Sequence, residues 1–343
     1  MTPEEKYALI TRNLEEVVGE EQLKDILKQR DMKVYLGTAP TGKPHLGYFI
    51  PLFKIRDFLN AGSEVTILFA DLHAFLDNMK SNWEQLKKRT QYYEFIIKEM
   101  LTVIGADISK LKFVRGLDYQ TSEKYTLDVY KIAALANVRD SQRAGAEVVK
   151  QSKNPKLSGL LYPVLQALDE EYLQVDAQFG GVDQRKIFMF AREFLPVVGY
   201  QKRVHLMSPL IGGLQPGGKM SASNPNSKID ILDEEKTVRK KLNKGFCEVG
   251  NVSENWFLDF LRLVAFPQLH DEKKTFIINR PEKFGGPLEF TTFDEVKESF
   301  VSEKLHPADL KMGVIDYVNI LLEPIRKKAK EVNLHELMMQ AYE

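Results

Sequence analysis

Short apolar runs that suit β-strands alternate with longer helical stretches over the first two thirds of this 343-residue chain. The alternation predicts a mostly parallel sheet with helices on both faces, a Rossmann-like, doubly wound α/β fold. Ligands of such sheets bind beyond the carboxyl ends of the strands, so the loops after the strands are the first places to examine. The predicted strands are Lys33–Ala39, Glu64–Ala70, Leu111–Val114, Leu173–Phe179 and Arg203–Met207. The predicted helices include Tyr48–Asn60, Trp83–Ile104, Ser122–Ala136 and Asp183–Phe194.

The spacing of glycine and proline changes after Arg203. Both crowd into residues 212–218, and a stretch rich in serine and asparagine follows up to residue 227. After Lys228 the pattern is mostly helical, with one Gly/Pro-rich break. We therefore predict an α/β domain of residues 1–228 that carries any catalytic site, and a mainly α-helical C-terminal domain of residues 229–343.

The balance of charges limits the classes of partner. Lysine plus arginine and aspartate plus glutamate each number 48, so the formal net charge is zero, which argues against DNA and against strong non-specific nucleic-acid binding. No run of about 18 apolar residues is present and the start lacks an apolar leader, so we expect neither a membrane partner nor secretion. A single cysteine, Cys247, excludes an internal disulfide and favours a cytoplasmic location.

The loop after the first predicted strand is the first candidate site. The sequence from Gly37 to Lys43 fits the phosphate-binding pattern G-x-x-x-x-G-K, but Pro44 stands where that pattern needs a serine or threonine hydroxyl. The alternative is a helix that begins near His45, where a neutral imidazole donates to a phosphate and Gly47 lets a base or ribose approach the backbone. A histidine that only stabilises a tight turn is the simplest interpretation of this loop alone.

A glycine-hinged loop near residue 220 is the second candidate. It carries Lys219, Met220, Ser221 and Ser223 directly after a Gly-Gly pair. An ammonium on such a loop can neutralise charge on a leaving pyrophosphate, and the hydroxyls can support it. A solvated linker is the simpler interpretation when this loop is considered alone.

The two loops together resemble the ATP motifs of the class I aminoacyl-tRNA synthetases. That family writes the motifs His-Ile-Gly-His and Lys-Met-Ser-Lys-Ser, and this chain has His45-Leu46-Gly47-Tyr48 and Lys219-Met220-Ser221-Ala222-Ser223, so residues 217–224 correspond to the second motif loop. Tyr48 and Ala222 depart from the pattern. The resemblance implies catalytic roles for His45, Lys219, Ser221 and Ser223, and ATP contacts from Gly37, His45, Gly47, Lys219 and Met220.

Polar residues on one predicted helix face indicate a pocket. Tyr162, Gln166 and Asp169 are spaced at i, i+4 and i+7, beside apolar neighbours, although a solvated helix face has the same pattern. Two glycines then end the fourth predicted strand and open the next helix, from which Gln184 would project.

The segments Tyr162–Asp169 and Val175–Lys186 resemble the archaeal and eukaryotic cytosolic tyrosyl-tRNA synthetases, and the resemblance extends over essentially the whole chain. It implies that Tyr35 and Asp169 bind the substrate phenol and that Tyr162, Gln166 and Gln184 hold its α-amino group. A carboxylate accepts a hydrogen bond from a phenol, so phenylalanine would leave buried polar groups unpaired. His73, after the second predicted strand, is a lesser candidate for the pocket wall.

The resemblance implies a two-step reaction with ATP, L-tyrosine and tRNA(Tyr). The tyrosine carboxylate attacks the α-phosphate of ATP, and the tyrosyl group then passes to the terminal ribose of the tRNA. Mg²⁺ would arrive with ATP, no tightly bound cofactor or protein-held metal is expected, and a homodimer would form through a segment near residues 136–157. The resemblance also implies that these 343 residues lack an editing domain and the extra C-terminal modules of some relatives.

Contacts with tRNA are expected at two places. By resemblance, Phe284, His306 and Asp309 would read the first base of the anticodon. Arg185, a basic residue beside the predicted pocket, would touch the acceptor stem. The alternative for His306 and Asp309 is a helix N-terminus with a capping carboxylate. Local acidic stretches cancel local basic clusters in the net charge, so a few localised contacts with tRNA remain compatible with its value of zero.

Two other functions remain open from the residues. The nearest is a tryptophanyl-tRNA synthetase, because its second motif is also written Lys-Met-Ser-Ala-Ser. The other is a tRNA- or RNA-binding protein of synthetase type that has lost catalysis, given Tyr48 and Ala222.

Overall fold

A six-stranded sheet lies at the centre of the computed structural model, which describes residues 1–77, 82–148, 156–215, 217 and 228–343. The strand order is β1-β6-β5-β2-β3-β4; β1 is antiparallel to β6 and the other neighbours are parallel. The α/β prediction is therefore confirmed, and the order reverses between β2 and β5, where such sheets bind ligands. The strands are β1 (Glu16–Val18), β2 (Lys33–Thr38), β3 (Glu64–Phe69), β4 (Leu111–Arg115), β5 (Ala177–Gly181) and β6 (Val204–Ser208).

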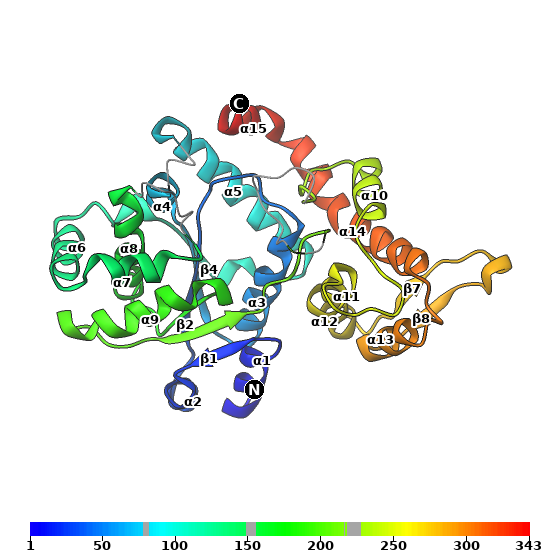
Figure 1. Cartoon of the computed structure of the whole chain (residues 1–343), viewed down its shortest axis with the longest axis horizontal. Coiled ribbons are helices and arrows are strands. Elements are labelled where there is room, and N and C mark those ends of the chain that lie inside the picture. Colours follow the sequence, from blue (N-terminus) through cyan, green and yellow to red (C-terminus); the bar gives the residue numbers. More distant parts are fainter. Residues whose placement is uncertain (78–81, 149–155, 216, 218–227) are drawn as a thin grey trace.

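Helices cover both faces of the sheet (Figure 1). Helices α3 and α5 pack on one side, and α6, α7, α8 and α9 lie on the other. Helix α3 buries Lys54, Arg56 and Asp57 as well as its apolar residues, so it is enclosed almost all round. The helices of this part are α1 (Pro3–Thr11), α2 (Glu20–Gln29), α3 (Phe49–Asn60), α4 (Asp71–Leu76), α5 (Trp83–Val103), α6 (Glu123–Leu135), α7 (Val138–Gly145), α8 (Leu157–Tyr172) and α9 (Arg185–Phe194).

The chain after Lys228 is mostly helical and includes a small antiparallel hairpin of β7 (Phe276–Ile278) and β8 (Leu288–Phe290). One buried apolar cluster runs from α3 and α5 into these helices, and α15 returns to pack against α5. No helix among the described residues has the length and apolar character to cross a bilayer. The helices are α10 (Glu235–Asn243), α11 (Trp256–Phe260), a π-helical turn (Leu261–Ala265), α12 (Phe266–Asp271), α13 (Phe293–Val301), α14 (Pro307–Glu331) and α15 (Leu334–Tyr342).

The predicted strand Leu173–Phe179 is wrong in its first half. Leu173 caps α8, and Gln174 has a left-handed backbone with φ 53°, which breaks an extended run. The Asp176 carboxylate accepts from the backbone N–H of Lys33 at 2.8 Å, so residues 173–176 form a turn before β5. The short edge strand β1 was not predicted, because three residues carry too little pattern.

Candidate active site

His45 lies at the turn between β2 and α3. It precedes a 3₁₀ turn, Leu46–Tyr48, and its Nδ1 accepts from the Gly47 N–H at 3.2 Å, which assigns the proton of the neutral ring to Nε2. Burial, with the charge of Lys228 nearby, lowers the pKa of His45 to about 4. The ring is therefore a neutral donor at pH 7, as the sequence suggested, and its role toward a phosphate stays a prediction.

The loop before His45 is held through its backbone carbonyls by side chains from α5 and α15. Arg89 Nη1 donates to the Thr41 carbonyl at 2.7 Å. Tyr93 and Tyr342 both donate from their hydroxyls to the Gly42 carbonyl, the latter at 3.2 Å. Residues far apart in the sequence thus fix the conformation of the first motif loop.

Residues 228–231 lie directly on the His45 turn. The Leu46 N–H donates to the Ile229 carbonyl at 2.9 Å, and His45 forms an isolated β-bridge with Asp230. Lys228, almost fully buried, pairs with Asp230 at 2.7 Å. The described chain that follows the second motif is therefore anchored at the first motif.

Tyr48 and Ala222 are the two departures from the family motifs. Tyr48 meets the His45 ring edge-on with centroids 5.2 Å apart, and its hydroxyl lies 3.3 Å from that of Tyr93, so it supports the turn. Ala222 lies outside the described residues, as do the predicted site residues Lys219, Met220, Ser221 and Ser223.

Helix α8 supplies the polar face that the sequence indicated. Its Tyr162 and Asp169 are buried and Gln166 is half-buried, which excludes the solvated-face alternative. Gln166 Nε2 donates to Gln184 Oε1 at 3.1 Å, so α8 and the turn after β5 meet. Tyr35 on β2 is fully buried and its hydroxyl donates to the Gln166 carbonyl at 3.3 Å, a long bond that leaves it near the others.

Asp169 is the most perturbed acid in this region. Its Oδ1 accepts from Tyr119 at 2.7 Å, Gln120 at 2.8 Å and Tyr125 at 2.9 Å, while Oδ2 lies 3.9 Å from His73 Nε2, beyond hydrogen-bond distance. Burial raises the pKa of Asp169 to about 6, and the three donors oppose that rise. One oxygen is therefore saturated and the other remains available to a ligand.

The three donors to Asp169 were missed from the sequence. Tyr119 and Gln120 follow β4 at the carboxyl edge of the sheet, so the rule that directs attention to loops after strands could have found them. Tyr125 lies on α6 and has no comparable local signal. His73 is buried against Tyr162, with ring centroids 4.7 Å apart; neither of its nitrogens has a hydrogen-bond partner among the described residues, and burial lowers its pKa to about 4.

One cavity of about 430 Å³ brings these residues together at the switch point of the sheet. Its lining residues include Gln178, Asp77 and Asp183 besides the predicted ones. Gly37 faces it with open space at its Cα, since an added Cβ would meet only Tyr35 within 4 Å. Among the described residues no cluster of three metal-ligating side chains is present. The predicted residues in the lining are Tyr35, Gly37, His45, Gly47, His73, Tyr162, Gln166, Asp169 and Gln184.

The predicted tRNA-contacting residues lie elsewhere. Phe284, between β7 and β8, is 61% exposed. Arg280 donates to the Gly286 carbonyl at 3.0 Å and to Asp309 at 3.3 Å, which ties the hairpin to the start of α14. The predicted helix N-terminus is confirmed, because α14 begins at Pro307; its capping group is His306, which accepts from the Ala308 N–H, whereas the Asp309 carboxylate lies in the first turn and accepts from Arg280.

Arg185 pairs with Glu16 of β1 at 2.7 Å. It does not line the cavity, although it follows Gln184 at the start of α9. A tRNA contact from Arg185 stays a prediction.

Comparisons with known proteins agree with this geometry. "Tyrosine--tRNA ligase, cytoplasmic" from Danio rerio is 59% identical over 342 residues, which is 100% of this chain and 64% of that protein. The protein of the same description from Saccharomyces cerevisiae is 54% identical and covers 95% of this chain and 84% of its own length. The chain thus spans less than two thirds of the length of its vertebrate relatives.

Solved structures show the same arrangement. The crystal structure of tyrosyl-tRNA synthetase complexed with L-tyrosine from Archaeoglobus fulgidus has a TM-score of 0.87 and 40% identity, covering 95% of this chain and 99% of that one. The family described as tRNA synthetases class I (W and Y) matches residues 27–323. The chain belongs to this family of class I tRNA synthetases.

Proposed function

We propose that this chain acts as a tyrosine–tRNA ligase, which activates L-tyrosine with ATP and transfers it to tRNA(Tyr). The observation that carries the proposal is the buried Asp169, whose Oδ1 is saturated by three donors while Oδ2 is left for a phenol. The tyrosine complex of the archaeal relative supports the same assignment. Tyr35, which is fully buried and lines the same cavity, would complete the bonding of the substrate hydroxyl.

The amino group of the substrate would lie between α8 and the turn after β5. Gln166 and Gln184, already hydrogen-bonded to each other, present their remaining amide groups there with the Tyr162 hydroxyl. Asp77 and Asp183 also line the cavity and add negative potential that suits an ammonium. The substrate carboxylate would then point toward the His45 turn.

Adenylate formation would proceed by displacement at the α-phosphate. A carboxylate oxygen of tyrosine bonds to phosphorus while pyrophosphate leaves with its electron pair, and Mg²⁺ comes with the nucleotide. His45 Nε2–H would donate to a phosphate oxygen without adding charge of its own. A ribose hydroxyl of tRNA then attacks the acyl carbon and AMP leaves, so the work of the protein is positioning and electrostatic stabilisation.

Amino-acid-dependent exchange of pyrophosphate into ATP tests the first step. We expect exchange with tyrosine and none with phenylalanine; exchange with tryptophan instead would assign the other amino acid of this family, and no exchange with any amino acid would favour a binding protein. Asp169→Asn should lower kcat/KM for tyrosine by about tenfold to a hundredfold, since a charged acceptor is lost. Asp128→Asn is the matched control, because Asp128 is equally buried and also accepts from tyrosine hydroxyls, away from the cavity.

Transfer to tRNA would depend on the exposed hairpin and the start of α14. Phe284 offers a ring for stacking, and Asp309 and His306 lie where Arg280 joins the two elements. Phe284→Ala should reduce kcat/KM for tRNA(Tyr) without changing tyrosine-dependent exchange. An equal loss in both reactions would contradict a role for Phe284 in tRNA binding.

A homodimer is supported by apolar side chains on α6 and α7 that no other part of the described chain covers. Leu127, Tyr130 and Val138 are 52%, 66% and 59% exposed; Leu127 and Tyr130 lie one helical turn apart on α6, and Val138 begins α7. Tyr130→Glu should shift the mass in light scattering from dimer to monomer. Ile320→Glu, at an apolar residue of α14 that is 74% exposed, should leave it unchanged. We also propose a cytoplasmic location, as in the names of the relatives.

A further inference from the structure

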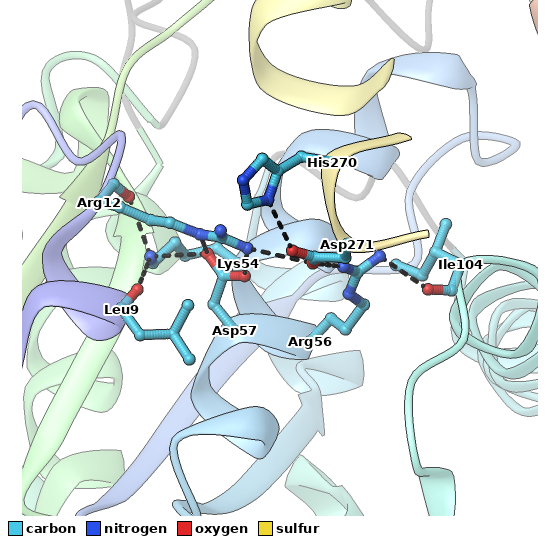
Figure 2. Close-up of polar contacts among 8 residues, drawn as sticks. All are labelled: Leu9, Arg12, Lys54, Arg56, Asp57, Ile104, His270 and Asp271. Atoms are coloured by element: carbon cyan, nitrogen blue, oxygen red, sulfur yellow. Dashed lines mark hydrogen bonds and ion pairs between the residues drawn. The ribbon is translucent and has the colours of Figure 1, made fainter. Parts of the chain in front are cut away.

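A network of five charged side chains surrounds the middle of α3, away from the proposed tyrosine pocket (Figure 2). Arg12 donates two hydrogen bonds to the Asp57 carboxylate, one of them from Nε at 2.8 Å, and Lys54 Nζ lies 3.0 Å from the same carboxylate. On the neighbouring side of α3, Arg56 donates to Asp271, which also lies 3.6 Å from Arg12.

The cations of α3 contact backbone carbonyls at the carboxyl ends of two helices and the side chain of the last residue of a third. Lys54 donates to the carbonyls of Leu9 and Arg12 at the end of α1, at 2.8 and 2.9 Å. Arg56 donates to the Ile104 carbonyl at the end of α5 at 3.0 Å, and Asp271 is the last residue of α12. The last carbonyls of a helix carry partial negative charge, so the contacts of Lys54 and Arg56 with these carbonyls stabilise the ends of α1 and α5, whereas α12 is held through the Asp271 carboxylate.

The two halves of the network differ in burial. The side chains of Lys54, Arg56 and Asp57 are 6%, 5% and 7% exposed, so they belong to the interior of the α/β part. Asp271 is 33% exposed and is the network's contribution from the helical C-terminal part. The contact between Arg56 and Asp271 is therefore a polar link between α3 and the end of α12, beside an apolar core that is continuous between the two parts of the chain.

Helix α3 reaches both the cavity and this link. Its residues 50–52 line the cavity wall, and Arg56 follows one turn later. The same helix begins directly after the His45 turn. A shift of α12 against α3 would therefore change where the hairpin and the start of α14 stand relative to the cavity, and small misplacements of reacting groups are costly to a reaction rate.

We propose that Arg56 and Asp271 are positioning residues that fix the helical C-terminal part against α3, so that a tRNA bound at Phe284, His306 and Asp309 is placed with its acceptor end at one of the two cavities of the proposed homodimer. The inference rests on the proposed function. It predicts that charging of tRNA depends on this ion pair and that activation of tyrosine does not.

The test compares the two reactions in Asp271→Asn, which keeps the shape of a partly exposed side chain and removes its charge. We expect pyrophosphate exchange within about twofold of the parent and kcat/KM for tRNA(Tyr) reduced about five- to tenfold, the size of a lost coupling contact. A tRNA with a changed first anticodon base should be penalised less in the variant than in the parent, because anticodon binding is no longer transmitted. Asp271→Glu, which restores the charge, should recover most of the loss.

Asp259→Asn is the matched control. Asp259 lies on α11 in the same part of the chain, its side chain is also 33% exposed, and it pairs with Arg262 within its own helical segment at 3.2 Å. It should leave the ratio of the two reactions unchanged. Equal losses in exchange and charging, unchanged charging by Asp271→Asn, or the same selective loss in Asp259→Asn would overturn the inference. Absence of exchange in the parent chain would instead refute the proposed function.

Discussion

Replacement of Tyr119 by phenylalanine should shift the pH dependence of tyrosine binding upward. The Tyr119 hydroxyl donates to Asp169 Oδ1 at 2.7 Å. The Tyr119 ring packs beside the rings of Tyr125 and Tyr172, so removal of the hydroxyl should leave the ring in place. The donors of Oδ1 lower the pKa of Asp169, whereas burial raises it to about 6. Loss of one donor therefore leaves burial less opposed, and the carboxyl group titrates at higher pH.

The size of the shift follows from the strength of the bond. A hydrogen bond to a charged group contributes about 1.5–3 kcal/mol, which corresponds to a displacement of roughly one to two pH units. With a pKa of about 6, Asp169 is about nine-tenths ionised at pH 7 and can accept from the substrate phenol. In Tyr119→Phe the ionised fraction at pH 7 falls, so KM for tyrosine should rise about two- to tenfold there and return toward the parent value near pH 9.

Pyrophosphate exchange or direct titration with tyrosine, measured from pH 5 to 9, gives the midpoint for each protein. Tyr317→Phe is the control, because Tyr317 also loses a buried bond of 2.9 Å, to Gln268, in the other part of the chain. An unchanged midpoint in Tyr119→Phe, or an equal shift in Tyr317→Phe, would refute the reasoning that Oδ1 donors set the acidity of Asp169.

Three further outcomes follow from the same structure. Tyr342→Phe deletes the bond to the Gly42 carbonyl in the loop before His45, so KM for ATP should rise about two- to fivefold in exchange assays while KM for tyrosine stays constant. Asp57→Ala leaves buried cations without their carboxylate and should cost about 3 kcal/mol in urea unfolding, against under about 0.5 kcal/mol for the exposed Asp25→Ala. Because the raised pKa of Asp169 makes the folded state bind the extra proton, the free energy of unfolding should fall by about 2 kcal/mol as pH rises from 4 to 6, and Asp169→Asn should remove that fall.

The strands of the sheet were predictable where apolar and β-branched residues dominate. Lys33–Thr38 and Glu64–Phe69 match their predicted runs within one residue. The error before β5 arose because alternation at Leu173 and Val175 also fits a turn, and the turn is decided by a distant partner, the N–H of Lys33. Local pattern cannot reveal a contact that lies more than a hundred residues away.

The residues of the candidate site were likewise predictable only where local spacing in the sequence indicates them. Tyr162, Gln166 and Asp169 were found because helical spacing places them on one face of α8. The donors that control Asp169 come from about 50 and 44 residues earlier and converge only when β4 and α6 pack beside α8. Spacing therefore identified the groups that would meet a substrate, whereas the groups that tune their acidity required the tertiary structure.

The zero net charge gains a physical meaning from where the charges lie. In the basic cluster of α10, Arg239 pairs with Asp316 at 3.1 Å and Lys241 pairs with Asp233 at 2.6 Å, so part of its charge is already neutralised within the fold. The buried network of α3 uses further cations to satisfy helix ends. Because these cations are already paired within the fold, the chain has a weak general attraction for phosphates. Recognition of a tRNA must then depend on a few positioned groups. Because those groups lie on both parts of the chain, the fixed placement of one part against the other contributes to the specificity for the tRNA.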